Sequence, residues 1–174
     1  MSKTNCIPVR TTVWPTRGLP AVFDFALATN RRTAIILALI SLLAFLPGFF
    51  QISPIDRDEP RYAQATKQMI ETNDYVDIRF INEEANDKPV GIYWLQAAAV
   101  KTAEALGVHG ARDKIWVYRL PSLLGAVGAV LGTFWCALAF VDRRYAALAA
   151  LMMAASTLLG VEARLAKTDA VLLL

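Results

Sequence analysis

The chain has 174 residues, 56% of them hydrophobic and 19% charged, with a net charge of +3 and a mean hydropathy of +0.40. Soluble domains carry about 25% charged residues, and here the apolar residues are gathered in blocks. This composition excludes a disordered chain, a coiled coil and a disulfide-stapled secreted module. The basic residues form no amphipathic face, which argues against nucleic-acid binding. From the apolar composition and its arrangement in blocks we predict a membrane protein.

The first apolar block, residues 34–50, follows the basic sequence Asn30-Arg31-Arg32. A basic segment before an apolar core is also the pattern of a signal peptide, but a small-x-small cleavage site does not follow this block. Its 17 residues are near the lower limit for crossing about 30 Å of hydrocarbon. We therefore expect a retained membrane-spanning helix.

Two further apolar blocks, residues 120–141 and 145–161, are separated only by residues 142–144. So short a connection predicts a helical hairpin across the bilayer. Gly128 and Gly132 in the first of these blocks would allow another helix to approach closely.

The charges between the blocks predict the topology. The tail, residues 1–32, holds five basic residues against one acid, and residues 142–144 hold two arginines. By the positive-inside rule both segments are cytoplasmic, which places residues 51–117 and 162–169 outside. A fourth block starts at Ala170 and has only five residues, so we expect the chain to be the N-terminal part of a longer protein and to be inactive by itself.

The predicted outer segment begins with an amphipathic helix. Pro60 suits a first turn, and Asn73-Asp74 suits the end of the helix. Its apolar face consists of Tyr62, Ala65, Met69 and Ile70. A short alternating stretch with Val76, Ile78 and Phe80 follows.

A second helix is expected from Gly91 to Leu106, ended by Gly107. Its apolar face is predicted to consist of Ile92, Leu95, Ala99, Ala103 and Leu106. Two amphipathic helices between membrane spans are expected to lie on the bilayer surface, as packing elements or as the roof of a site for lipid-borne substrates.

The densest polar sequence, residues 56–62, comes directly after the first predicted span. One interpretation is a charged helix start, in which the acids before Pro60 cap the first turn. The other is a pair of carboxylates, Asp58 and Glu59, held at the membrane surface for proton abstraction or cation binding.

A second polar sequence, residues 162–169, precedes the fourth apolar block. It is either an ordinary interfacial loop with Arg164 and Lys167 reaching toward water, or part of a site. Two spans separate Asp58 from Asp169, so both acids lie on the same predicted side and can converge over one cavity. Acids beside a span are costly without a partner or a role.

Two basic residues are weaker candidates. Lys88 stands in a predicted turn before Tyr93-Trp94, which suit an aromatic belt, and it could instead neutralise a phosphate as a point charge. Arg119, at the entry of the second span, is expected to be an interface anchor.

The order of these motifs resembles the polytopic, lipid-dependent glycosyltransferases of the GT-C type. The nearest group is the bacterial branch of the protein O-mannosyltransferase superfamily, which includes the aminoarabinose transferases that modify lipid A. The resemblance covers residues 35–174, with Val90 in place of the second proline of the family's Lys-Pro-Pro motif. The four matching motifs are Asp58-Glu59-Pro60-Arg61-Tyr62-Ala63, Lys88-Pro89 with Tyr93-Trp94, Tyr118-Arg119-Leu120-Pro121-Ser122, and the stretch from Ala163-Arg164 to Thr168-Asp169-Ala170.

The resemblance implies an all-α polytopic fold in the bacterial inner membrane, with residues 33–174 as part of the catalytic domain. It implies transfer of a sugar from a polyprenyl phosphate, with inversion, to lipid A or another envelope lipid or glycan. The donor sugar stays open among an aminopentose, a uronic acid and a hexose.

The resemblance also implies roles for individual residues. Asp58 would be the principal carboxylate, Glu59 its support and Asp169 the second carboxylate. Lys88, and more weakly Arg61, would stabilise the departing phosphate. Two further motif residues are candidates for substrate binding, Tyr62 and Arg164.

Three alternatives remain open on the sequence. A divalent cation could bridge Asp58 and Asp169, although the spacing does not establish a metal. A non-catalytic membrane scaffold or sensor with an external helical cap would also explain the topology. A transporter is disfavoured, because the apolar blocks carry no ionisable group near their middle.

Overall fold

The computed structural model describes residues 25–54, 57–80, 83–84 and 89–174, and most of them are helical. The helices are α2 (Asn30–Phe45), α3 (Asp58–Thr72), α4 (Val90–Ala105), α5 (Ile115–Ala137), α6 (Arg143–Ala154), α7 (Thr157–Glu162) and α8 (Asp169–Leu172). A single 3-10 turn, η1 (Ala111–Asp113), precedes α5, and two short antiparallel strands, β1 (Arg79–Phe80) and β2 (Glu83–Glu84), form a ribbon beside α3.

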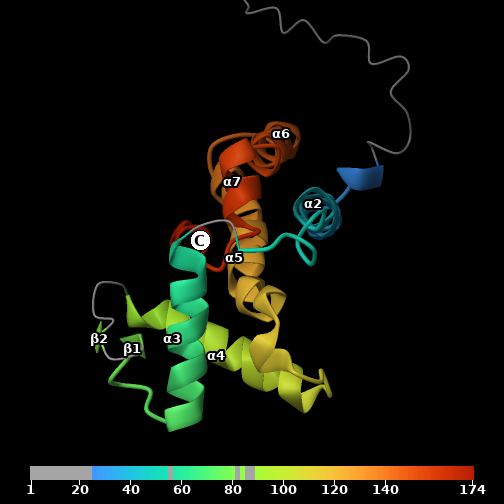
Figure 1. Ribbon diagram of the computed structural model, residues 1–174. Coiled ribbons are helices and arrows are strands. Elements are labelled where there is room, and N and C mark those ends of the chain that lie inside the picture. The colour runs from blue at the N-terminus through green and yellow to red at the C-terminus, as the bar shows by residue number, and fades with distance from the viewer. Residues whose placement is uncertain (1–24, 55–56, 81–82, 85–88) are drawn as a thin grey trace, which may run out of the picture.

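Helix α5 is the element against which most of the others pack (Figure 1). Helices α2, α4, α6 and α8 contact it directly, and α3 packs on α4. One apolar core lies between α5, α2, α6 and α7, and includes Phe45, Phe49, Val130 and Phe134. A second core lies between α3, α4 and the start of α5.

Within the described part of the chain, α5 is the one helix that is both long and apolar enough to cross a membrane. It has 23 residues and begins at Ile115, before the predicted start at residue 120. At 1.5 Å per residue it is about 35 Å long, which exceeds the roughly 30 Å of a bilayer's hydrocarbon.

The first predicted span has different limits from those expected. Helix α2 begins at Asn30, where the side chain of Thr29 accepts a hydrogen bond from the Arg32 backbone N–H, and it ends at Phe45. The expected end at residue 50 is wrong because Pro47 disfavours helix at the residue before it, and Gly48 turns the chain with a φ of 81°. The 16 residues of α2 extend about 24 Å.

The third predicted span, residues 145–161, is not one helix. Helix α6 ends at Ala154, and α7 begins at Thr157 after Ser156, which has an extended backbone. The Ser156 hydroxyl accepts a hydrogen bond from the Leu159 N–H, so this residue starts a new helix inside an otherwise apolar sequence. A single polar N-cap residue therefore divides into two helices a sequence whose hydropathy predicts one.

The two helices expected in the outer segment are confirmed as α3 and α4. The predicted face of α3 is buried, and Asn73 ends the helix with a left-handed φ of 56°. The predicted face of α4 is only half correct, because Leu95 and Leu106 are 46% and 79% exposed. The α4 side chains that face the core are Ile92, Tyr93, Gln96, Ala97, Val100 and Ala103.

Helix α8 packs closely on α5 at Gly125. A Cβ atom at this position would lie 2.7 Å from the carbonyl oxygen of Ala170 and 2.9 Å from the Cα of Val171. Glycine is therefore required here by the approach of another backbone. A Cβ at Gly132 would meet no described atom within 4 Å.

Gly125→Ala should lower the melting temperature of the purified, detergent-solubilised protein. Overpacking costs about 1–3 kcal/mol, which exceeds the gain in helix propensity of at most about 1 kcal/mol. Gly132→Ala is the matched control and should leave the melting temperature unchanged or slightly higher. Equal melting temperatures for the two variants would contradict the packing of α8 on α5.

Candidate functional site

The residues that the structure describes include a buried ion pair between Glu59 on α3 and Arg119 on α5. Both side chains are fully buried, and the Arg119 Nε and Nη2 atoms donate to Glu59 Oε1 at 2.6 Å and Oε2 at 3.2 Å. The remaining terminal nitrogen of Arg119 donates to the Phe49 carbonyl oxygen at 2.9 Å. The ion pair therefore joins the end of the first helical region to α3 and α5.

The loop between α7 and α8 is bound to the same place. The Ala166 N–H donates to Glu59 Oε1 at 3.1 Å, and Gln96 Nε2 on α4 donates to the Ala166 carbonyl at 3.4 Å. The Ser122 hydroxyl on α5 donates to the Lys167 carbonyl at 2.9 Å. We call the four buried side chains, Glu59, Gln96, Arg119 and Ser122, the polar junction.

The polar junction satisfies charges that would otherwise be costly to bury. Removing an ion from water costs several kcal/mol in a protein interior, and mutual attraction offsets this only when the remaining hydrogen-bonding groups are satisfied. Glu59 accepts three hydrogen bonds, two from Arg119 and one from Ala166. Arg119 binds the two oxygens of Glu59 as a fork, a geometry that lysine cannot provide.

The two aspartates predicted to be catalytic flank this junction. Asp58 precedes Glu59 in the first turn of α3 and is partly buried. Asp169 is exposed in the first turn of α8, three residues after Ala166, and its Oδ1 is 3.4 Å from the Thr168 hydroxyl. The segments that carry the two acids are thus hydrogen-bonded to each other through Glu59 and Ala166.

The capping interpretation of the acids before Pro60 needs correction. Arg57, not Asp58, occupies the N-cap position of α3. Asp58 and Glu59 lie within the first turn, where their negative charge suits the positive end of the helix dipole. Glu59 is pointed into the core and is engaged by Arg119, so its interactions in the structure are those of a packing and positioning residue.

The predicted substrate-binding residues are dispersed. Tyr62 is 4% exposed and packs on the ring of Tyr93, with 5.5 Å between centroids. Arg61 is exposed, with its guanidinium 5.3 Å from the centroid of the Phe80 ring. Lys88 lies outside the described residues.

Arg164 connects the α7–α8 loop to the end of α2. Its Nε donates to the Pro47 carbonyl at 2.8 Å and its Nη2 to the Ala44 carbonyl at 2.7 Å, and its third nitrogen binds the Gly160 carbonyl. Carbonyl oxygens therefore engage all three guanidinium nitrogens, and the geometry is that of a structural link between two helical regions.

Sequence reasoning missed the role of three residues in the polar junction. The sequence predicts that Arg119 is an interface anchor, whereas it is fully buried, and the sequence assigns no role to Gln96 or to Ser122 of the same motif as Arg119. The sequence does contain a signal for buried polar residues, because a charged or amide side chain within an apolar helix requires a buried partner. Gln96 has a second such partner in Thr66, whose hydroxyl donates to its Oε1 at 2.7 Å.

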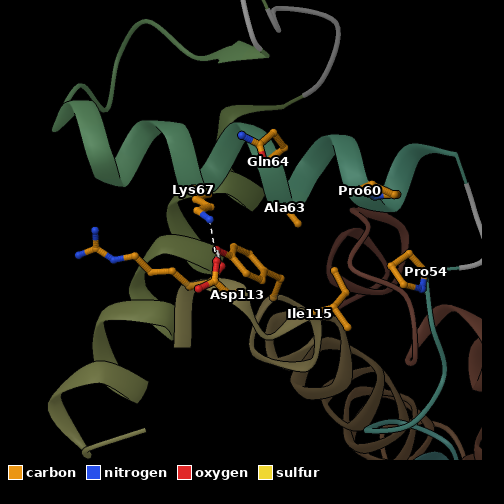
Figure 2. Close-up of a pocket in the computed structure, with 9 residues that line it drawn as sticks. Pro54, Pro60, Ala63, Gln64, Lys67, Asp113 and Ile115 are labelled. Atoms are coloured by element: carbon orange, nitrogen blue, oxygen red, sulfur yellow. Dashed lines mark hydrogen bonds and ion pairs between the residues drawn. The ribbon is translucent and has the colours of Figure 1, made fainter. Parts of the chain in front are cut away.

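A separate cleft of about 300 Å³ opens between α3, η1 and the start of α5 (Figure 2). Lys67 and Asp113 face each other across it with 2.7 Å between Nζ and Oδ1. Lys67 holds the pKa of the Asp113 carboxyl below its usual range, and Asp113 raises the pKa of Lys67. Arg112, also at this cleft, is paired with Glu104 at 2.6 Å. These mutual pairings leave the cleft without a strong net attraction for an anion.

A metal ligand set is not formed by the residues that the structure describes, since nowhere among them do three or more histidine, cysteine or acidic side chains gather. The bridging cation left open by the sequence therefore stays untested. Comparison with known proteins gives no relative: no family model, no curated protein and no solved structure matches the chain.

Removing one member of the buried pair should destabilise the protein strongly. Glu59→Leu or Arg119→Leu should each cost about 3–5 kcal/mol, because the other charge is left uncompensated. The double variant should cost clearly less than the sum of the two, as measured by denaturant unfolding in detergent.

Glu104→Gln is the control, because it removes one partner of an ion pair whose side chains are 41% and 35% exposed. It should change the unfolding midpoint little, since exposed pairs contribute little to stability. Additive losses in the Glu59 and Arg119 variants would contradict the buried ion pair.

Proposed function

We propose that the chain belongs to a membrane glycosyltransferase that takes a sugar from a polyprenyl phosphate and gives it to an acceptor outside the cytoplasm. The observation that carries this proposal is the convergence of three motifs at the polar junction. Glu59 comes from the first motif, Arg119 and Ser122 from the third, and Ala166 and Lys167 from the last. Motifs that are distant in sequence but meet at one place support a shared site.

Asp58 is the proposed base of this reaction. The oxygen of an acceptor hydroxyl attacks the anomeric carbon as its proton passes to the Asp58 carboxylate. The bond between that carbon and the phosphate oxygen breaks, and the lipid phosphate leaves with the bonding electrons. Attack opposite the leaving group inverts the anomeric configuration. Asp169 would orient the acceptor from the adjoining segment.

The leaving group needs cations instead of an acid, because a phosphate is already anionic. Lys88 remains the first candidate for this role and Arg61 the second, since the exposed guanidinium of Arg61 is on the same helix as Asp58. If the acceptor is itself a phosphate, such as that of lipid A, it is already ionised. Asp58 would then mainly place the acceptor.

The proposed location is the bacterial inner membrane, with several passes. Besides α5, the helices α2 and α6 present large apolar side chains outward, which suits contact with lipid. Leu39 and Leu43 of α2 are 55% and 74% exposed, and Leu148 and Met152 of α6 are 55% and 69% exposed. Side chains of this kind form an exposed apolar surface that water would disfavour.

A non-catalytic scaffold or sensor is the second candidate. The full engagement of Glu59 and Arg164 in contacts within the protein favours it, because both residues could be retained for folding alone. It gives no role to Asp58 and Asp169, whose segments flank the polar junction. The two candidates therefore differ in what the loss of the Asp58 charge should do.

The topology can be tested by cysteine labelling in intact cells. In a background with Cys6 and Cys136 replaced by serine, a membrane-impermeant maleimide should label Val76→Cys and should not label Asp142→Cys. Val76 is 87% exposed and lies in the proposed outer segment. Labelling of position 142 without position 76 would overturn the arrangement.

Asp58→Asn should lower sugar transfer by about a hundred-fold or more, the scale of losing a positioned acid-base group. The change keeps the shape of the side chain and removes its ability to take a proton. Transfer is measured by mass spectrometry of envelope lipids and glycans from the native host. Expression and membrane insertion should match the wild type.

Asp113→Asn is the matched control, because the Asp113 side chain is 72% exposed and belongs to the separate cleft. It should transfer sugar at the wild-type rate. A well-inserted Asp58→Asn variant with normal transfer would contradict the assignment of Asp58 as the base, whereas the absence of transfer by the full-length wild type would favour the scaffold.

A further inference from the structure

The segment between α7 and α8 is held by side chains from three different helices. Glu59 of α3 accepts from the Ala166 N–H, Gln96 of α4 donates to the Ala166 carbonyl, and Ser122 of α5 donates to the Lys167 carbonyl. Connecting segments usually run over the surface and satisfy their backbone groups with water. Here Ala163, Leu165, Ala166 and Thr168 are buried, so the segment is built into the interior.

The side chains that bind this segment are themselves fixed by further hydrogen bonds. Arg119 fixes both oxygens of Glu59 and is fixed in turn by the Phe49 carbonyl, while the hydroxyl of Thr66 fixes the amide of Gln96. Support of this kind restricts each side chain to one rotamer, which is what precise placement of a site requires.

The holding contacts lie a short chain distance from both aspartates. Asp58 is the neighbour of Glu59, and Asp169 is three residues beyond Ala166. Three residues span at most about 10 Å of extended chain. The contact between Glu59 and Ala166 therefore limits how far Asp169 can lie from Asp58.

We propose that Arg119, Gln96 and Ser122 are positioning residues that, through Glu59 and the Ala166–Lys167 backbone, hold Asp169 at a fixed place relative to Asp58. The inference rests on the proposed function for the roles of the two aspartates. It adds that the reaction depends on three side chains that touch neither substrate. Their loss should slow the chemical step and leave donor binding intact.

The test combines hydrogen exchange with kinetics in the detergent-solubilised full-length protein. The variants are Arg119→Lys, which keeps the charge but cannot bind Glu59 as a fork, and Gln96→Leu. Ser122→Ala removes a single hydrogen bond and keeps the ion pair, so it provides a variant whose folding is least disturbed. Arg112→Lys is the matched control, because Arg112 binds Glu104 in the same two-pronged way on the surface.

In each variant of the polar junction the amides of residues 163–168 should exchange about tenfold faster or more, as expected when a buried hydrogen bond is lost. For Arg119→Lys and Gln96→Leu, kcat should fall by about a hundred-fold, the effect of a misplacement near 1 Å. The KM for the lipid-linked donor should stay within about twofold, because ground-state binding is retained. Arg112→Lys should change neither quantity.

Three outcomes would overturn the proposal: unchanged exchange of residues 163–168, faster exchange spread evenly over the whole protein, or a loosened segment with normal kcat. Absence of sugar transfer by the full-length wild type would instead overturn the proposed function. In that case faster exchange confined to residues 163–168 would still establish that the polar junction holds the segment. Only the proposed dependence of sugar transfer on this segment would be contradicted.

Discussion

The buried ion pair between Glu59 and Arg119 is the interaction on which the arrangement of the helices depends. It lies where the chain after α2, the start of α3, the start of α5 and the loop before α8 come together. In a low-dielectric interior neither charge can be left alone, so the four segments have to meet in this one way. The apolar contacts between helices are less directional and would tolerate other arrangements.

At the polar junction, residues that are close in sequence differ in burial. Successive side chains on a helix point about 100° apart, so the inward direction of Glu59 turns Asp58 toward the rim of the core. On the other segment Ala166 is buried and Asp169 is exposed. A buried contact can thus have two carboxyl groups beside it that stay at least partly exposed, which is the condition that the proposed base and its companion require.

Two small residues of α5 position α8 and the loop that precedes it. Gly125 lets the backbone of α8 approach to distances that a Cβ atom would forbid, while Ser122, one turn earlier, binds the loop that leads into α8. The same helix is the described element that can cross a membrane. Helix α5 therefore joins the core formed with α2, α6 and α7 to the second core formed with α3 and α4 (Figure 1).

The sequence by itself determined the helical class, the two helices of the segment after α2, the end of α3 at Asn73 and the apolar character of α5. These follow from local properties: side-chain period, turn residues and hydropathy. It did not determine the end of α2 at Phe45 or the break at Ser156, because hydropathy averages over the single residues that stop a helix. The sequence also did not determine the buried face of α4. This helix is apolar on several sides, and only its contacts with α3 and α5 decide which side is buried.

The polar junction was decided by the tertiary structure alone. Glu59 and Arg119 are 60 residues apart, and Arg119 and Phe49 are 70 apart. Nothing local distinguishes a glutamate that enters the core from one that faces water. The sequence named Asp58, Glu59 and Asp169 as a group of acids, whereas in the folded chain Asp58 is partly buried and Asp169 is exposed. Glu59 is fully buried, and its ion pair with Arg119 offsets the cost of removing its charge from water.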